Sequence, residues 1–149
     1  MAAVTFASAP SAPLYQSWHV LSRGIEIQSV RALIAAQNYT NAESVGRTPD
    51  EAPYARQMIE IEAKTQPFSN IAMPSIRRIS NDPIPPREVY MPGHPAADHK
   101  GLVKVPNINK QLEMVDFKNA NMGISGCARL YALNSQMNQS VHNLMRQNA

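Results

Sequence analysis

Apolar residues in the first forty positions recur at alternating steps of four and three. The series is Leu14, Trp18, Leu21, Ile25, Gln28, Ala32, Ala35 and Tyr39, with Gln28 as its one polar member. Steps of four and three place all of these positions on one face of an α-helix. The pattern therefore predicts an N-terminal helix and a following loop within residues 14–48.

A similar stripe runs through the last forty residues. Its main members are Leu130, Leu133, Met137, Val141 and Leu144, with Leu112, Val115 and Met122 upstream. We expect a C-terminal helix within residues 107–149, whose stripe forms a seam with the first helix and with adjacent subunits. Gly123 and Gly126 each cost about 1 kcal/mol relative to alanine inside a helix. They indicate either a kink or the close approach of a neighbouring backbone.

Proline divides the chain into these two arms and a middle region. Ten of the twelve prolines fall between Pro49 and Pro106, and proline excludes helix interiors. Between them, QMIEIEA (57–63) alternates apolar and acidic residues as a strand does, and IRRI, REVY and LVKV are weaker strand candidates. We predict a flexible segment at 1–13 and a β/loop region at 49–106. The fold class is mainly α with a small β/loop insertion.

Charged side chains are absent from two long stretches near the ends of the chain. No Asp, Glu, Lys or Arg occurs in residues 1–22 or 130–145, and residues 134–143 carry mainly amides and hydroxyls. A free-standing helix usually carries charged residues on its wet face, whereas hydrogen-bonded amides are less costly to bury than unpaired charges. The pattern indicates ends that are enclosed in an assembly.

The composition excludes several classes of protein. The net charge is +3 with scattered basic residues, which disfavours nucleic-acid binding. The single Cys127 cannot form a disulfide within the chain, and no apolar run approaches the ~20 residues of a membrane-spanning helix. The N-terminus lacks the basic start and apolar core of a signal peptide, so we expect no cleaved leader.

The stretch YMPGHPAADHKG (90–101) raises the question of a metal site. His94 and His99 are five residues apart with Pro95 between them, which is not the spacing of a helical zinc pair. A third strong ligand besides Asp98 would have to come from distant chain. Turns are the better interpretation, because Pro-Gly and Asp-x-x-Gly sequences favour them. After this stretch, Pro106 ends a strand, and either Asn107 or Asn109 could cap the next helix.

Four ordered motifs resemble the flagellar basal-body rod proteins of bacteria. AQNYTNAES (36–44) is similar to the box that ends the N-terminal helix in that family, and APYARQ (52–57) to the segment that opens its middle region. VYMPGHPAADHKGLVKVPNIN resembles the family loop nearly end to end, and ARLYALN (128–134) its C-terminal motif. The resemblance covers residues 14–147.

The two apolar stripes and the resemblance together assign residues to two roles. The family loop motif contains Pro53, Tyr54, Tyr90, Pro92, Gly93, His94, Pro95, Ala97, Gly101, Val103, Pro106 and Asn107. The helix-packing and assembly positions are Leu14, Trp18, Leu21, Ile25, Asn38, Asn41, Leu130, Tyr131, Leu133, Asn134, Met137, Val141 and Leu144.

The resemblance also implies a fold and a function. Long terminal helices would pair as a coiled-coil-like unit around the axis of a hollow rod, which crosses the periplasm and transmits motor torque. Subunits would leave through the flagellar type III export apparatus. The implied partners are copies of the chain, other rod proteins and the rod–export-gate adaptor, with no cofactor, metal, nucleic acid or small-molecule substrate.

Alternatives from other classes stay open. One is another axial subunit of the flagellum, and another is a small non-catalytic interaction module. An enzyme would need convergent acid, base or nucleophile groups, whereas the four histidines are spread along the chain at His19, His94, His99 and His142. The residues therefore favour a structural protein without catalysis.

Overall fold

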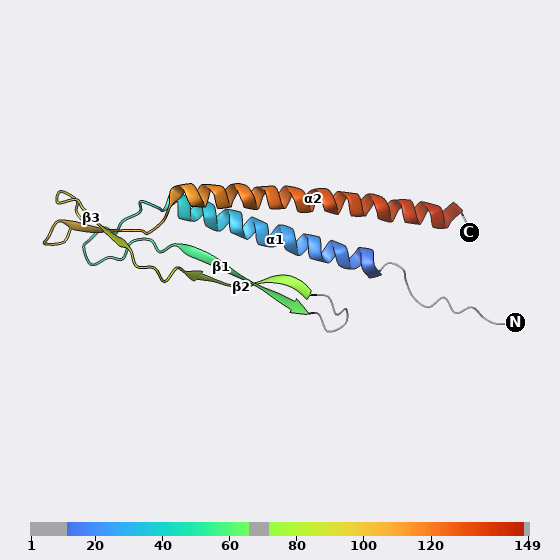
Figure 1. Ribbon diagram of the computed structural model, residues 1–149, viewed down its shortest axis with the longest axis horizontal. Helices are drawn as coiled ribbons and strands as arrows, with labels where there is room; N and C mark the ends of the chain where they lie inside the picture. The colour runs from blue at the N-terminus through green and yellow to red at the C-terminus, as the bar shows by residue number, and fades with distance from the viewer. Residues whose placement is uncertain (1–11, 66–71, 148–149) are drawn as a thin grey trace.

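A computed structural model describes residues 12–65 and 72–147, which form an elongated molecule of three tiers (Figure 1). Helix α2 (Lys110–Gln147) lies along helix α1 (Ala12–Thr40), and a β-hairpin lies on the other side of α1. The hairpin consists of β1 (Gln57–Thr65) and β2 (Ala72–Asn81). A second pair, β3 (Arg87–Tyr90) and β4 (Leu102–Val105), forms a small head at one end.

Helix α1 is the middle tier, and it buries residues on more than one side. Ile27, Ala32, Ile34, Ala35 and Asn38 are buried along it. A helix enclosed by two neighbours needs apolar residues beyond a single stripe, which explains why Ile27 and Ile34 lie outside the heptad series. The predicted N-terminal helix is present, and residues 1–11 of the predicted flexible segment lie outside the described part of the chain.

Helix α2 begins at a well-formed cap. The Asn109 side-chain oxygen accepts hydrogen bonds from the backbone nitrogens of Gln111 at 3.0 Å and Leu112 at 3.3 Å. These bonds satisfy two of the amides that have no partner inside a first helical turn. Of the two asparagines that the sequence offered as caps, Asn109 is therefore the one used.

The two glycines of α2 differ in their surroundings, and the helix runs through both without interruption. A Cβ atom on Gly123 would lie 2.9 Å from the Gln28 side chain of α1, whereas one on Gly126 would meet nothing within 4 Å. At Gly123 the close neighbour is therefore the Gln28 side chain and not a backbone. Close approach does not explain Gly126, which lies in open space in the single chain.

The seam between the helices is made of small and polar residues. Asn134 donates to the Ser17 hydroxyl at 2.6 Å, and a Cβ on Gly24 would lie 3.2 Å from the Cys127 sulfur. At the other end Asn38 donates to Glu113 at 3.1 Å.

Two further features fill this seam. Ala120 is fully buried between these contacts, and the Trp18 ring stacks on the Tyr131 ring with centroids 5.9 Å apart. Small residues allow two helices to approach closely, and each paired amide removes the cost of burying it.

The hairpin pairs in antiparallel register from Gln57 opposite Asn81 to Thr65 opposite Ala72. The register shifts between Glu60 and Ile61, so that Arg77 of β2 is the extra residue of a bulge. Met73 is buried on this hairpin, and both strands contact α1. The hairpin contains the predicted segments 57–63 and 76–79, extended at both strands.

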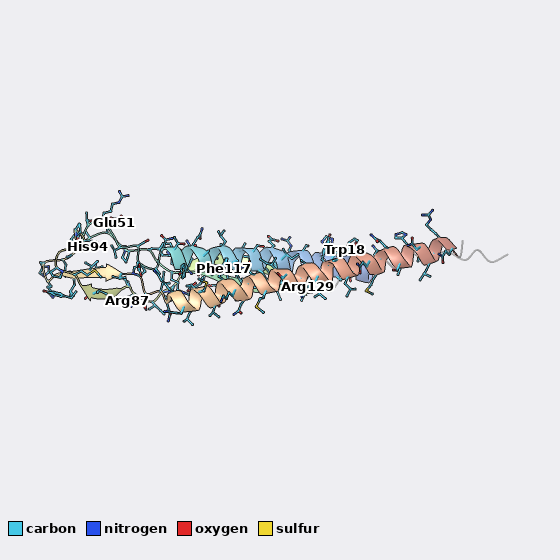
Figure 2. The ribbon with its side chains drawn as sticks, turned by 90° about the horizontal axis from the view of Figure 1, so that it is seen from above. Trp18, Glu51, Arg87, His94, Phe117 and Arg129 are labelled. Carbon is cyan, nitrogen blue, oxygen red and sulfur yellow. The ribbon has the colours of Figure 1, made fainter. Side chains whose placement is uncertain are left out.

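The head has a small core of its own. Ala96, Val103 and Val105 are buried together, and Val45, Val89 and Ala97 pack against them. Strand β3 pairs antiparallel with β4 from Arg87 opposite Val105 to Tyr90 opposite Leu102. Figure 2 shows Glu51, Arg87 and His94 at this end of the molecule and Trp18 far along the helices.

The coarse fold prediction is confirmed: two long helices flank a middle of short antiparallel strands. The predicted seam between the C-terminal stripe and the first helix is not a buried one. The side chains of Leu130, Leu133, Met137, Val141 and Leu144 are 40% to 59% exposed in the single chain. The face of α2 that meets α1 instead carries Glu113, Ala120 and Asn134.

Candidate functional site: a polar latch and the outer face of α2

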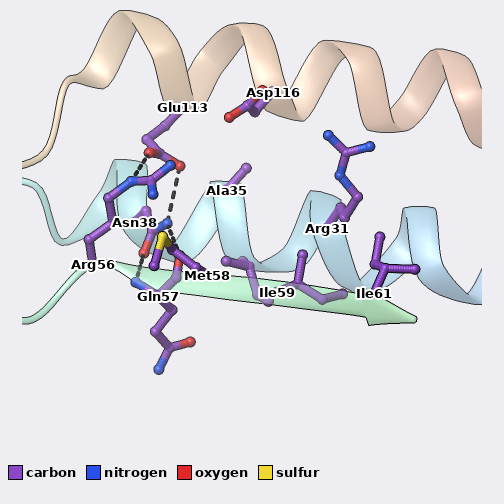
Figure 3. Close-up of a pocket in the computed structure, with 11 residues that line it drawn as sticks. Arg31, Ala35, Asn38, Arg56, Gln57, Met58, Ile59, Ile61, Glu113 and Asp116 are labelled. Atoms are coloured by element: carbon purple, nitrogen blue, oxygen red, sulfur yellow. Dashed lines mark hydrogen bonds and ion pairs between the residues drawn. The ribbon is translucent and has the colours of Figure 1, made fainter. Parts of the chain in front are cut away.

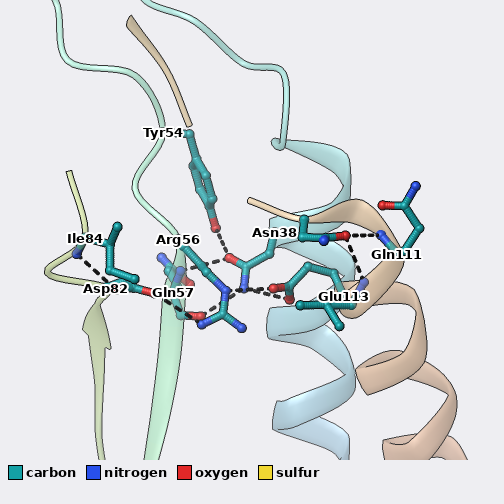
Figure 4. A network of polar contacts seen from close by, with 10 residues as sticks. Asn38, Tyr54, Arg56, Gln57, Asp82, Ile84, Gln111 and Glu113 are labelled. Atoms are coloured by element: carbon teal, nitrogen blue, oxygen red, sulfur yellow. Dashed lines mark hydrogen bonds and ion pairs between the residues drawn. The ribbon is translucent and has the colours of Figure 1, made fainter. Parts of the chain in front are cut away.

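Asn38 is the centre of a buried polar network that joins the two helices to the start of the hairpin (Figure 4). Its side-chain oxygen accepts from the Gln57 backbone nitrogen at 2.9 Å and from the Tyr54 hydroxyl at 3.1 Å. Its side-chain nitrogen donates to the Gln57 carbonyl at 2.9 Å and to Glu113 at 3.1 Å. All four bonding positions of the amide are therefore used, in a side chain that is 1% exposed.

Two ion pairs that share Arg56 extend this network into the middle region. The Arg56 Nε donates to Glu113 at 2.7 Å, and its Nη1 lies 3.4 Å from an Asp82 oxygen. Asp82 in turn accepts from the Ile84 backbone nitrogen at 3.0 Å. Burial lowers the pKa of Arg56, but the bonds and charges of Glu113 and Asp82 outweigh burial and raise it. Arg56 therefore stays charged and partly compensates a Glu113 that is only 2% exposed.

We call Asn38, Tyr54, Arg56, Gln57, Asp82 and Glu113 the latch. Burial and the nearby Glu113 charge raise the pKa of Tyr54, so its hydroxyl keeps the proton that it donates to Asn38. The sequence singled out Asn38 and Tyr54 through motifs. Arg56 lies in the quoted APYARQ segment but received no role of its own, and Glu113 and Asp82 received none, because a charged residue on an expected helix or turn is normally solvated.

A groove of about 350 Å³ begins beside the latch (Figure 3). Its banks are α2, with Asp116, and β1, with Met58, Ile59 and Ile61. Its floor is α1, with Ile34 and Ala35. The groove opens to solvent and combines apolar residues of α1 and β1 with polar ones, and Arg31 and Asp116 are its charged residues beyond the latch.

The outer face of α2 is the second feature. We use this name for the exposed apolar residues Leu112, Val115, Met122, Leu130, Leu133, Met137, Val141 and Leu144. They follow the whole helix, and residues 130–145 carry no charge that would hold them in water. An apolar surface this long is unusual for a monomer and is typical of an interaction surface.

Other predicted helix residues lie in different places. Leu21, Ile25 and Asn41 are half-buried, Trp18 and Tyr131 stack, and Asn134 is buried against Ser17. The side chain of Leu14 lies outside the described part of the chain.

The family loop forms two tight turns in the head. The His94 Nδ1 accepts from the Ala96 backbone nitrogen at 3.1 Å, and one Asp98 oxygen accepts from Lys100 and Leu102, each at 2.8 Å. These backbone bonds, the one from Leu102 above all, lower the pKa of Asp98. Gly101 has φ 77°, which disfavours any residue with a Cβ. The His94 Nδ1 and the Asp98 carboxylate therefore help to shape the loop.

The remaining loop-motif residues surround these turns. Val103 and Pro106 are buried, Pro53 and Ala97 are half-buried, and Tyr90, Pro92, Gly93, Pro95 and Asn107 are exposed. Within residues 12–65 and 72–147, no group of three or more His, Cys, Asp or Glu side chains is placed to hold a metal ion. None of the described helices is long and apolar enough to cross a membrane.

These observations define a class of protein. The molecule has a helix seam in which the buried side chains of Asn38, Glu113 and Asn134 are hydrogen-bonded, whereas the Trp18 Nε1 is buried there without a partner among the described residues. It also has a long apolar surface that is exposed in the single chain. Such a chain is a structural subunit of a larger assembly.

Comparison with curated proteins identifies the assembly. The chain is 35% identical over 73% of its length to the flagellar basal-body rod protein FlgC of Agrobacterium fabrum, of which it covers 78%. It is 31% identical over 89% of its length to FlgC of Yersinia enterocolitica, covering 92% of that protein, and 31% identical to FlgC of Borreliella burgdorferi, covering 93%. No protein-family model matches the chain.

The chain belongs to the family of flagellar basal-body rod proteins FlgC. It is a structural subunit of the proximal rod of the flagellar basal body, and it assembles with other rod components.

Proposed function

We propose that the outer face of α2 is the surface through which this subunit packs into the rod. The main support is that its apolar residues are exposed in the single chain although they recur with helical spacing along the whole of α2. Contact with water at every one of these positions is unfavourable, and covering them on assembly gains about 25 cal/mol for each Å² of apolar surface.

We further propose that α1 and α2 act as a coiled-coil-like unit. The contacting positions of α1 (Ser17, Gly24, Asn38) are seven and fourteen residues apart, as are their partners on α2 (Asn134, Cys127, Glu113). A contact that recurs every seven residues keeps two helices in register along their length. A unit of this kind resists bending, which suits a shaft that transmits motor torque across the periplasm.

The expected partners in detail are copies of this chain, other rod proteins, the rod–export-gate adaptor at the base, and the type III export apparatus during delivery. Head-to-tail contacts that do not close into a ring generate a helical tube, which supports growth by addition of subunits. No catalysis is part of this proposal.

The test is Leu133→Asp in cells that swim with this subunit. We expect loss of swimming in soft agar and loss of the subunit from purified basal bodies, while the protein is still made, because assembly would bury an unpaired carboxylate. Val141→Asp should act in the same way. Gln136→Ser, on the polar side of the same helix, is the matched control and should swim almost normally.

Normal swimming with Leu133→Asp present in the basal bodies would contradict the proposed packing surface. Loss of the protein from whole cells would point to a folding defect instead. The unfolding midpoint of the purified chain, described in the Discussion, separates that outcome from a defect in assembly.

A further inference from the structure

The hairpin has two free edges, and its strand geometry tells which backbone groups each edge presents. The described part of this sheet contains only β1 and β2, so each strand has one side without a strand neighbour. The Arg56 carbonyl accepts from Asp82 at 2.7 Å and so points toward β2. Gln57 bonds to Asn38 through both its N–H and its C=O, and therefore points the other way.

Antiparallel strands alternate between residues that bond inward and residues that point outward. Because Gln57 points outward, the N–H and C=O groups of Ile59, Ile61 and Ala63 do so as well. Their partners on β2 are Ile79, Ile76 and Pro74. Pro74 agrees with this assignment, because a residue without an N–H is tolerated where that group would point away from the ladder.

The two edges differ in whether they carry features that hinder pairing with another strand. The β2 edge carries Pro74 and the bulge at Arg77, which are devices that prevent another strand from pairing. The β1 edge has no proline and no extra residue. At its first outward position the Asn38 amide already makes the pair of bonds that a neighbouring strand would make.

The groove of Figure 3 runs along this open edge. Its strand-side lining comes from β1 and includes no residue of β2. Its other bank continues into the outer face of α2, because Leu112 lies one helical turn before Asp116. A neighbouring subunit on that face would therefore lie next to the groove.

We propose that the free edge of β1 accepts an extended segment of a second copy of this chain, and that residues 2–8 (AAVTFAS) are that segment. This proposal rests on the proposed rod function. Three outward residues of β1 match a strand of about five to seven residues.

The sequence of that segment fits the groove in three ways. It has no proline before Pro10, and Val4 and Phe6 alternate with Thr5 so that one side suits the apolar floor. It is also uncharged, which matters because a charged strand would lie near a like charge at either Arg31 or Asp116.

The experiment cross-links two differently tagged populations of the full chain, both carrying Cys127→Ser. One population carries Ala63→Cys and the other Ala7→Cys, and a short bismaleimide joins them. We expect a mixed cross-linked dimer. Adding Ile61→Pro to the first population removes one outward N–H, and this should reduce the yield about tenfold.

Ile79→Pro is the matched control, because it removes an outward N–H from the opposite edge and should leave the yield within about twofold. Circular dichroism of each variant checks that the helices are retained. A single chain carrying both Ala7→Cys and Ala63→Cys tests for a link within one copy.

Three results would overturn the proposal: no mixed dimer, a link only within one chain, or a yield that Ile61→Pro leaves unchanged in a folded protein. None of these would alter the behaviour of Leu133→Asp in cells. Failure of the strand-docking proposal is thus distinguishable from failure of the proposed rod-packing surface.

Discussion

The two faces of α2 differ in which types of residue they bury and expose. The face toward α1 buries Glu113 and Asn134, which are polar, whereas the outer face exposes Leu133, Met137 and Leu144. An ordinary amphipathic helix would place these residues the other way round. The difference teaches that α2 packs on α1 through small residues and hydrogen-bonded polar groups. Its long apolar face is exposed in the single chain.

The strongest test of this comparison is Glu113→Ala. The change leaves the Arg56 charge with only the longer contact to Asp82, and it removes one partner of Asn38. Breaking a buried ion pair costs about 3–5 kcal/mol, and we expect about 3 here because Arg56 is partly exposed. Urea unfolding of the purified chain measures the loss. Asp116→Ala, one turn along the helix, is the control and should change stability little.

A change of less than about 0.5 kcal/mol for Glu113→Ala would show that the inner face does not hold the fold together. In that case the polar residues of the seam would contribute little to stability, and the two faces of α2 would not differ in the way described above.

Asn109→Ala should have the next largest effect, a loss of about 1 kcal/mol, because two backbone amides of the first turn lose their acceptor. The frayed turn includes the residues that lead into Glu113, so the latch should loosen as well. Hydrogen exchange at the Gln111 and Leu112 amides reports the fraying. Asn107→Ala, the other asparagine before the helix, should leave this exchange unchanged, and equal effects of the two would argue against the assigned cap.

Alanine substitutions at the two glycines of α2 allow a direct comparison of its two faces. Gly126→Ala should stabilise the purified chain by about 0.5–1 kcal/mol, because a Cβ there meets nothing and alanine favours the helix. Gly123→Ala should gain less or lose stability, since its Cβ would press on Gln28 at 2.9 Å. Thermal unfolding measures both. If Gly126→Ala stabilises the chain but impairs swimming, a neighbouring subunit packs closely at that point.

The smallest effect on stability should come from Leu133→Asp in the purified chain. An exposed position changes the free energy of unfolding by no more than about 0.5 kcal/mol. The same substitution is expected to block rod assembly, so stability and assembly should separate at this residue. A loss of several kcal/mol in the purified chain would mean that Leu133 belongs to the chain's own core.

The local structure could largely be predicted from the sequence. The heptad series from Trp18 to Tyr39 and the exclusion of proline from both arms predict the two helices, because both signals depend only on neighbouring positions. The turns of the loop before Gly101 could be predicted in the same way. The latch could not be predicted, because Asn38, Arg56 and Glu113 come from three separate segments and no local pattern shows that their side chains meet.

The sequence by itself determined which parts of the chain are helical and that a long apolar stripe runs along the C-terminal helix. Only the tertiary structure decided which face of α2 meets α1. A hydrophobic period shows which side of a helix is apolar, but it does not show which partner, within the chain or outside it, covers that side. The pairing within one chain is decided instead by how closely two backbones can approach and whether buried amides and charges find partners. Gly24, Ala120 and Asn134 meet those conditions, and the leucine stripe remains exposed.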